Sequence, residues 1–168
     1  MRVLVTTASR HGGTREIGDT VAEVLRGAGH DVTHADPDDV EQLDGYDAVV
    51  LGSAVYVGRL AVAMRDLVDR QTEQLAARPV WLFWSGPVGV PPLPASEPDD
   101  VRTVARRVGA REVRAFGGRL QREDLGLAER ALVAMIDAQP GDFRNFDDVE
   151  EWAAGIAREL ARPARARR

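Results

Sequence analysis

The 168-residue sequence contains no cysteine and no lysine, so all 22 of its basic residues are arginine. Without cysteine the chain has no disulfides, no thiol nucleophiles and no cysteine metal ligands. Without lysine it has neither a Schiff-base amine nor the lysine that a Walker phosphate-binding loop requires. The residue types alone therefore exclude several common classes of catalytic site.

Long apolar runs and an excess of positive charge are also absent. No run approaches the ~20 apolar residues that a membrane-spanning helix needs. The net charge of -5 argues against general nucleic-acid binding. No cluster of histidines and carboxylates has a spacing suited to a metal ion. Because the first apolar run begins at residue 2, we expect no signal peptide and a cytoplasmic location.

Strand-like apolar runs alternate with helical patterns along most of the chain. We expect strands at 2–7, 30–35, 47–52, 79–85 and 112–118, and helices at 14–28, 60–75, 97–109, 125–136 and 147–160. This alternation predicts βαβ units and a parallel sheet, in a doubly wound three-layer α/β sandwich. No linker interrupts the pattern, so residues 1–162 are predicted to form one domain. The arginine-rich residues 163–168 are predicted to be a flexible basic tail.

The first strand is followed by "TTASRHGGTREIG" (6–18), a turn rich in hydroxyls and glycines that opens a helix. At the end of a parallel strand, converging backbone N–H groups and the helix dipole favour an anion. Ser9, His11 and Thr14 add possible donors. The turn lacks the glycine patterns of dinucleotide and nucleoside triphosphate sites. It therefore predicts a site for a single terminal phosphate, with a glycine-rich turn that binds nothing as the alternative.

Two further loops, "GSAVYVG" (52–58) and "SGPVGV" (85–90), follow the third and fourth predicted strands. Ligands of open α/β sheets lie at the carboxyl ends of the strands. Each loop begins with Gly or Ser and continues with apolar residues. Together with the phosphate turn, the loops predict a pocket for a flat phosphorylated ring, which would stack on side chains such as Tyr56.

These three loops, in this order, resemble those of the flavodoxin-like family. "SRHGGT" (9–14) is similar to the family's phosphate loop, [ST]-x-[ST]-G-x-T, with His11 in place of a hydroxyl residue. Within the family, the chain most resembles flavodoxin-domain proteins related to the menaquinone-dependent protoporphyrinogen dehydrogenase. The basic Arg10 after Ser9 and a long helical insertion at 118–146 carry that likeness. The resemblance implies a five-stranded parallel sheet of order 2-1-3-4-5, with the insertion after the fifth strand.

The resemblance also implies non-covalently bound FMN and no catalytic side chain, because the flavin itself carries the redox chemistry. The residues that it implies for the phosphate are Ser9, Arg10, His11, Gly12, Gly13 and Thr14. Those that it implies beside the ring are Ser53, Ala54, Val55, Tyr56, Ser85, Gly86, Pro87, Val88 and Gly89. Gly117 and Gly118 are expected to leave space there for a substrate.

Three functions agree with these features. The first is an FMN-dependent oxidoreductase. The most specific form of this hypothesis is oxidation of protoporphyrinogen with a quinone as the acceptor. The second is an electron carrier for protein partners, although a minimal carrier has no need of a long insertion. The third is a binding or regulatory module without flavin. The insertion helix would cover the pocket, pair with a second subunit in a homodimer, touch a membrane that supplies quinone, or simply pack on its own domain.

Overall fold

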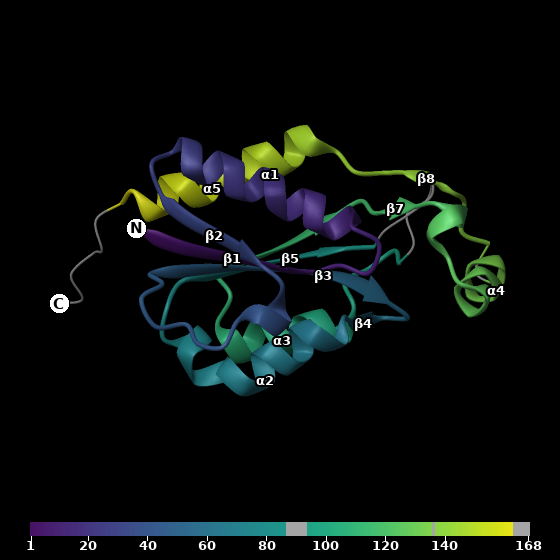
Figure 1. The fold of residues 1–168 in the computed structure, drawn as a ribbon, viewed down its shortest axis with the longest axis horizontal. Coiled ribbons are helices and arrows are strands. Elements are labelled where there is room, and N and C mark those ends of the chain that lie inside the picture. The colour runs from purple at the N-terminus through teal and green to yellow at the C-terminus, as the bar shows by residue number, and fades with distance from the viewer. Residues whose placement is uncertain (87–93, 136, 163–168) are drawn as a thin grey trace.

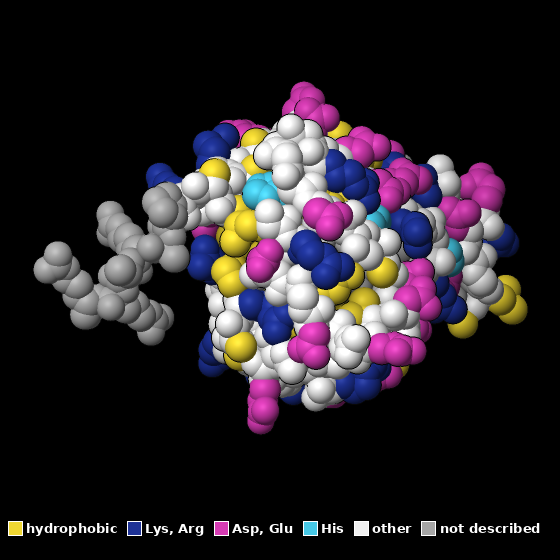
Figure 2. Space-filling view, turned by 60° about the vertical axis from the view of Figure 1, so that its left-hand side comes forward, with side chains coloured by type: hydrophobic (Ala, Val, Ile, Leu, Met, Phe, Trp, Pro, Cys, Tyr) yellow, Lys and Arg dark blue, Asp and Glu magenta, His cyan; other side chains and the backbone are white. Residues whose placement is uncertain are grey.

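The computed structural model describes residues 1–86, 94–135 and 137–162 (Figure 1). Three of the predicted ring-contacting residues, Pro87, Val88 and Gly89, lie outside the described residues, as does the predicted basic tail. On the face shown in Figure 2, arginine and acidic side chains are interspersed, as the small net charge leads one to expect.

The centre of the molecule is a parallel sheet. Its strands are β1 (Arg2–Ala8), β2 (Asp31–Ala35), β3 (Ala48–Tyr56), β5 (Val80–Ser85) and β6 (Glu112–Phe116). Their order is β2-β1-β3-β5-β6, which confirms the predicted order. In the middle of the sheet, Val50 of β3 lies opposite Val5 of β1 and Trp81 of β5. The reversal of strand order between β1 and β3 is where ligands bind in such sheets.

Helices cover both faces of the sheet (Figure 1). On one face lie α1 (Gly13–Gly27) and α5 (Phe146–Leu160), and on the other lie α2 (Val62–Ala76) and α3 (Asp99–Val108). A short 3-10 helix, η1 (Pro37–Asp39), follows β2. Helix α1 buries Ile17, Val21 and Leu25, which are four residues apart and therefore share one face. The fold confirms the predicted three-layer sandwich.

The core on the α1 and α5 side is organised by three aromatic rings. Phe83 of β5, Phe116 of β6 and Trp152 of α5 pack edge to face, with ring centroids 5.6 to 5.8 Å apart. Gly52 of β3 leaves the space that the Phe83 ring fills, because a Cβ at Gly52 would lie 2.1 Å from Phe83 Cζ. The cluster ties the two strands that end beside the predicted site to the last helix.

The predicted loop at 52–58 is wrong in its first half. Strand β3 continues to Tyr56 and then turns back into β4 (Arg59–Leu60), which pairs with it in an antiparallel ribbon. The two turn residues, Val57 and Gly58, have φ values of +49° and +73°. Such turns usually carry Asn-Gly or Asp-Gly, so a Val-Gly turn gives no hairpin signal in the sequence.

The predicted insertion after the fifth strand is present, and it contains more structure than a helix and a loop. It comprises β7 (Arg119–Leu120), the 3-10 turn η2 (Arg122–Asp124), α4 (Leu127–Met135) and β8 (Gly141–Asp142). Strands β7 and β8 pair antiparallel, so the base of the insertion is a two-stranded ribbon. Figure 1 shows α4 beyond this ribbon, at one end of the molecule. Among the described helices, none has the length and apolar character needed to cross a bilayer.

Candidate functional site

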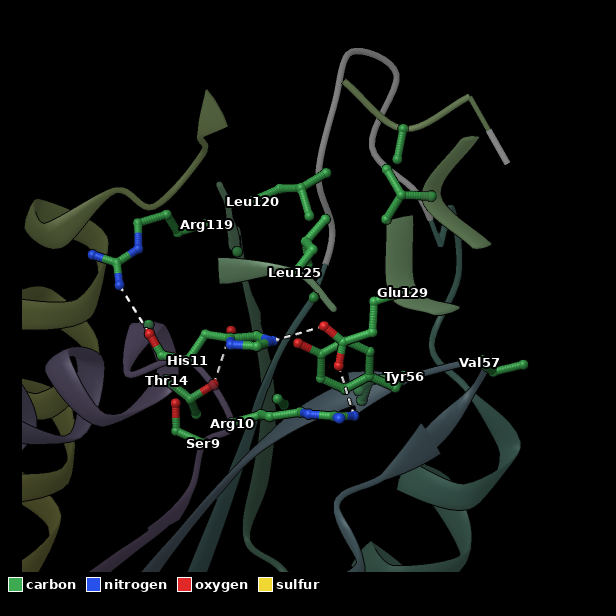
Figure 3. Close-up of a pocket in the computed structure, with 18 of the residues that line it drawn as sticks. Ser9, Arg10, His11, Thr14, Tyr56, Val57, Arg119, Leu120, Leu125 and Glu129 are labelled. Atoms are coloured by element: carbon green, nitrogen blue, oxygen red, sulfur yellow. Dashed lines mark hydrogen bonds and ion pairs between the residues drawn. The ribbon is translucent and has the colours of Figure 1, made fainter. Parts of the chain in front are cut away.

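A pocket of about 340 Å³ opens at the carboxyl ends of β1, β3 and β5, where the sequence places the ligand (Figure 3). Most of the predicted site residues line it together. These are Ser9, Arg10, His11, Gly13, Thr14, Ala54, Val55, Tyr56, Ser85 and Gly86. The structure therefore brings the phosphate turn and the starts of both predicted ring-contacting loops into one cavity.

Gly12 and Ser53 are predicted site residues that do not line the pocket. Gly12 precedes α1 in a left-handed conformation (φ 81°), which glycine adopts without steric cost. The hydroxyl of Ser53 accepts a hydrogen bond from the Ala61 N–H at 3.0 Å and donates one to the Ala54 carbonyl at 2.8 Å. Ser53 is fully buried, so it holds the β3–β4 hairpin in place.

The start of α1 carries backbone N–H donors that have no partner among the described residues. The first N–H groups of an α-helix have no partner within the helix, and no side chain caps the start of α1. The hydroxyls of Thr14, in the first turn of α1, and of Ser85, at the end of β5, are buried and lie 3.3 Å apart. Backbone amides and hydroxyls of this kind are the donor set that a phosphate group requires.

A carboxylate from the insertion lies against this turn (Figure 3). Glu129 of α4 forms an ion pair with Arg10 at 2.7 Å, and its other oxygen lies 3.2 Å from His11 Nε2. The Gly126 N–H also donates to that second oxygen, at 3.2 Å. Glu129 is the main site residue that sequence reasoning misses, because 118 residues separate it from His11.

The insertion also supplies the apolar far wall of the pocket. That wall consists of Leu120, Leu125, Leu132, Val133 and Ala138. Of the alternatives considered for the insertion helix, the structure supports the one in which the helix covers the pocket. Gly118 lines the cavity as expected, but Gly117 does not provide room for a substrate. A Cβ at Gly117 would lie 1.9 Å from the Phe143 carbonyl oxygen. Glycine is therefore needed at this position so that the backbone at Phe143 can pass close to it.

The phenol of Tyr56 reports on the position of Glu129. Burial raises the pKa of Tyr56, the Glu129 carboxylate raises it further, and Arg10 lowers it. Tyr46 and Tyr56 are the only tyrosines, so a Tyr46→Phe background isolates Tyr56. In that background we expect Glu129→Gln to lower the pKa of Tyr56 and Arg10→Gln to raise it, as measured by near-ultraviolet phenolate absorbance. If both substitutions left the pKa unchanged, α4 would not lie over Tyr56 in solution.

Comparison with known protein families shows the family to which this chain belongs. A sequence model of the flavodoxin domain matches residues 4–146. The chain belongs to the flavodoxin domain family. No curated protein sequence matches it.

Solved structures resemble this flavodoxin domain at low sequence identity. Oxidised flavodoxin 1 from Bacillus cereus is 18% identical, with a TM-score of 0.66 over 96% of this chain and 100% of that chain. Oxidised flavodoxin 2 from Bacillus cereus is 22% identical, with a TM-score of 0.64 over 95% and 99%. Rubredoxin oxygen:oxidoreductase from Desulfovibrio gigas is 14% identical, with a TM-score of 0.65 over 95% of this chain and 36% of that one. These likenesses show the fold.

FMN is the cofactor of the family, and the pocket of this flavodoxin domain fits it. The uncapped start of α1 and the hydroxyls of Thr14 and Ser85 match a phosphate group. Val55 and Tyr56 supply apolar surface of the kind that a flat ring requires.

Proposed function

We propose that this flavodoxin domain is an FMN-dependent oxidoreductase that moves electrons between a reduced organic substrate and an acceptor such as a quinone. The observation that carries the proposal is the apolar wall that the insertion adds to the pocket. FMN supplies the redox chemistry when bound. The protein residues bind it, exclude water and orient the substrate.

In this proposal the FMN phosphate lies on residues 9–14, at the start of α1. The ring lies between residues 53–56 and residues 85–89. The dipole of a 15-residue helix and its free N–H groups support the phosphate placement. Val55 and Tyr56, at the end of β3, support the ring placement because both contribute apolar surface to the cavity.

The substrate in this proposal is a largely apolar organic molecule held against Leu120, Leu125 and Leu132. Binding sites for such molecules are mostly apolar with a few polar groups, which matches this wall and the Arg10–Glu129 pair beside it. Protoporphyrinogen, with a quinone as acceptor, is the sharpest version. The resemblance of Ser9–Arg10 and of the insertion to the protoporphyrinogen dehydrogenase subgroup supports it, whereas the family match itself reaches only the flavodoxin domain.

An electron carrier needs an exposed rim that docks protein partners, and acidic groups near the ring would serve that purpose. Asp99 and Asp100 are the candidates near the fourth-strand loop. Asp99 forms an ion pair with Arg102, and Asp100 accepts a hydrogen bond from the Leu60 N–H at 2.8 Å. Asp100 is engaged within the chain, whereas the Asp99 side chain is 91% exposed, so an acidic docking rim at this position would rest on Asp99 alone, which favours the enzyme over the carrier.

The experiment is turnover of protoporphyrinogen by the FMN-loaded protein with a water-soluble naphthoquinone, followed by protoporphyrin fluorescence. We expect turnover, and we expect Leu132→Gln to raise KM while the flavin absorption stays unchanged. Leu127→Gln is the matched control, because Leu127 lies on the same helix but is 88% exposed and does not line the pocket. No turnover with FMN fully bound would exclude this substrate, and salt-sensitive reduction by a protein reductase would favour the carrier.

A further inference from the structure

Two arginines at the base of the insertion reach the backbone of the phosphate turn. Arg119 of β7 donates a hydrogen bond to the His11 carbonyl at 3.0 Å (Figure 3). Arg144, just after β8, donates to the Gly13 carbonyl at 3.3 Å. The carboxylate of Glu16 joins the two, with one oxygen 3.2 Å from Arg119 and the other 2.5 Å from Arg144. One ribbon of the insertion therefore contacts the turn at two carbonyls.

Arg144 is held firmly in this position. Its side chain is only 5% exposed, and it binds Asp142 through Nε at 2.8 Å and Nη2 at 2.7 Å. The ring of Phe146 covers the guanidinium at 5.0 Å. The hydrogen bonds between them raise the pKa of Arg144 and lower that of Asp142, so both groups stay charged around neutral pH. The guanidinium of Arg144 is buried while the Asp142 carboxylate is half exposed, and the bidentate geometry makes the pair more specific than most surface ion pairs.

A hydrogen bond to a carbonyl also determines the direction of the N–H in the same peptide group. A trans peptide is planar, with its C=O and N–H on opposite sides. The bond from Arg119 to the His11 carbonyl therefore fixes the N–H of Gly12, and the bond from Arg144 to the Gly13 carbonyl fixes the N–H of Thr14. Gly12 and Gly13 have more backbone freedom than the other residues of the turn, so the two hydrogen bonds restrain the part of the turn that is otherwise freest. A charged donor on a carbonyl also polarises the peptide and strengthens its N–H as a donor.

We propose that Arg119 and Arg144 are positioning residues for the FMN phosphate, and that the β7–β8 ribbon holds the phosphate turn in its binding conformation. The proposal rests on the proposed placement of the phosphate on residues 9–14. Glu16 and Asp142 balance the two guanidinium charges locally, so the effect comes from the geometry of the turn more than from added positive charge. In this proposal the insertion has two roles: it forms one wall of the pocket, and it holds the phosphate turn in place.

The test compares FMN with riboflavin, which lacks the phosphate. The full chain is stripped of cofactor and titrated with each ligand by flavin fluorescence. For Arg119→Gln and for Arg144→Gln we expect the Kd of FMN to rise about tenfold, equivalent to about 1.4 kcal/mol, while that of riboflavin changes by less than about twofold. Arg119→Lys keeps a charged donor and is expected to recover part of the loss. Arg107→Gln is the matched control, because it removes an ion pair with Asp69 on the opposite face of the sheet.

Two results would contradict the account, and they are distinguishable. If Arg119→Gln leaves the ratio of the two Kd values within about twofold of the native ratio, or weakens both ligands equally, the positioning role is wrong. If the native protein itself binds riboflavin as tightly as FMN, the proposed phosphate placement fails instead. Arg119 is more exposed than Arg144, at 19%, so it decides the question if Arg144→Gln does not fold.

Discussion

Replacing Gly13 with glutamate is expected to abolish FMN binding while the protein stays at least as stable as before. Gly13 is the first residue of α1 and lines the pocket. A Cβ there would have its nearest contact, Arg119 Cβ, at 3.7 Å, which is an ordinary distance. A carboxylate in the first helical turn is stabilising by up to about 1 kcal/mol, and replacing a helical glycine adds a similar amount.

The same carboxylate would lie where the phosphate is proposed to bind. Two negative charges at close range in a partly enclosed site repel strongly, so we expect the Kd of FMN to rise by at least about 100-fold. Gly13→Gln has nearly the same shape without the charge and separates repulsion from bulk. Thermal unfolding and titration with FMN and riboflavin measure both effects. If Gly13→Glu bound FMN as tightly as the native protein, the phosphate would not lie on this turn.

A large loss of stability is expected from Gly52→Ala. The added Cβ would lie 2.1 to 2.8 Å from three atoms of the Phe83 ring. That ring cannot move freely, because Phe116 and Trp152 pack against its other sides. Overpacking of this kind costs about 3 kcal/mol or more, so we expect Tm to fall by roughly 6 to 12 °C for a chain of this size.

Thermal unfolding of Gly52→Ala, Phe83→Leu and the double variant checks this explanation. A smaller side chain at Phe83 makes room for the new methyl group, so the double variant should lose less than the two single variants together. Gly52 does not line the pocket, so the surviving folded protein should still bind FMN. A fall in Tm of less than about 2 °C for Gly52→Ala would contradict the packing described here.

Much of the fold was predictable because its signals are local. The runs at 47–52 and 79–85 are continuously apolar, which is typical of strands buried on both faces, and both are strands in the structure. The phosphate turn was predictable for the same reason, since strand, turn and helix start are contiguous. The end of β3 was not, because Val57–Gly58 lacks the residues that usually mark a two-residue hairpin.

The contacts of the insertion could not be predicted from the sequence. Glu129 is one of several acidic residues in and around a short amphipathic helix, and nothing near it indicates that it meets Arg10 and His11. Arg119 and Arg144 are two of many arginines, and each reaches the phosphate turn from more than 100 residues away. Such pairings depend on how the ribbon and α4 fold back over the sheet, and no local pattern encodes that.

The most direct test of the central claim is the visible absorption spectrum of the purified chain, followed by release and identification of any cofactor. We expect a yellow protein that yields FMN in equimolar amount, or a colourless one that becomes yellow when FMN is added. A colourless protein that does not bind added FMN would contradict the claim that this pocket is a flavin site, and the redox function would fall with it.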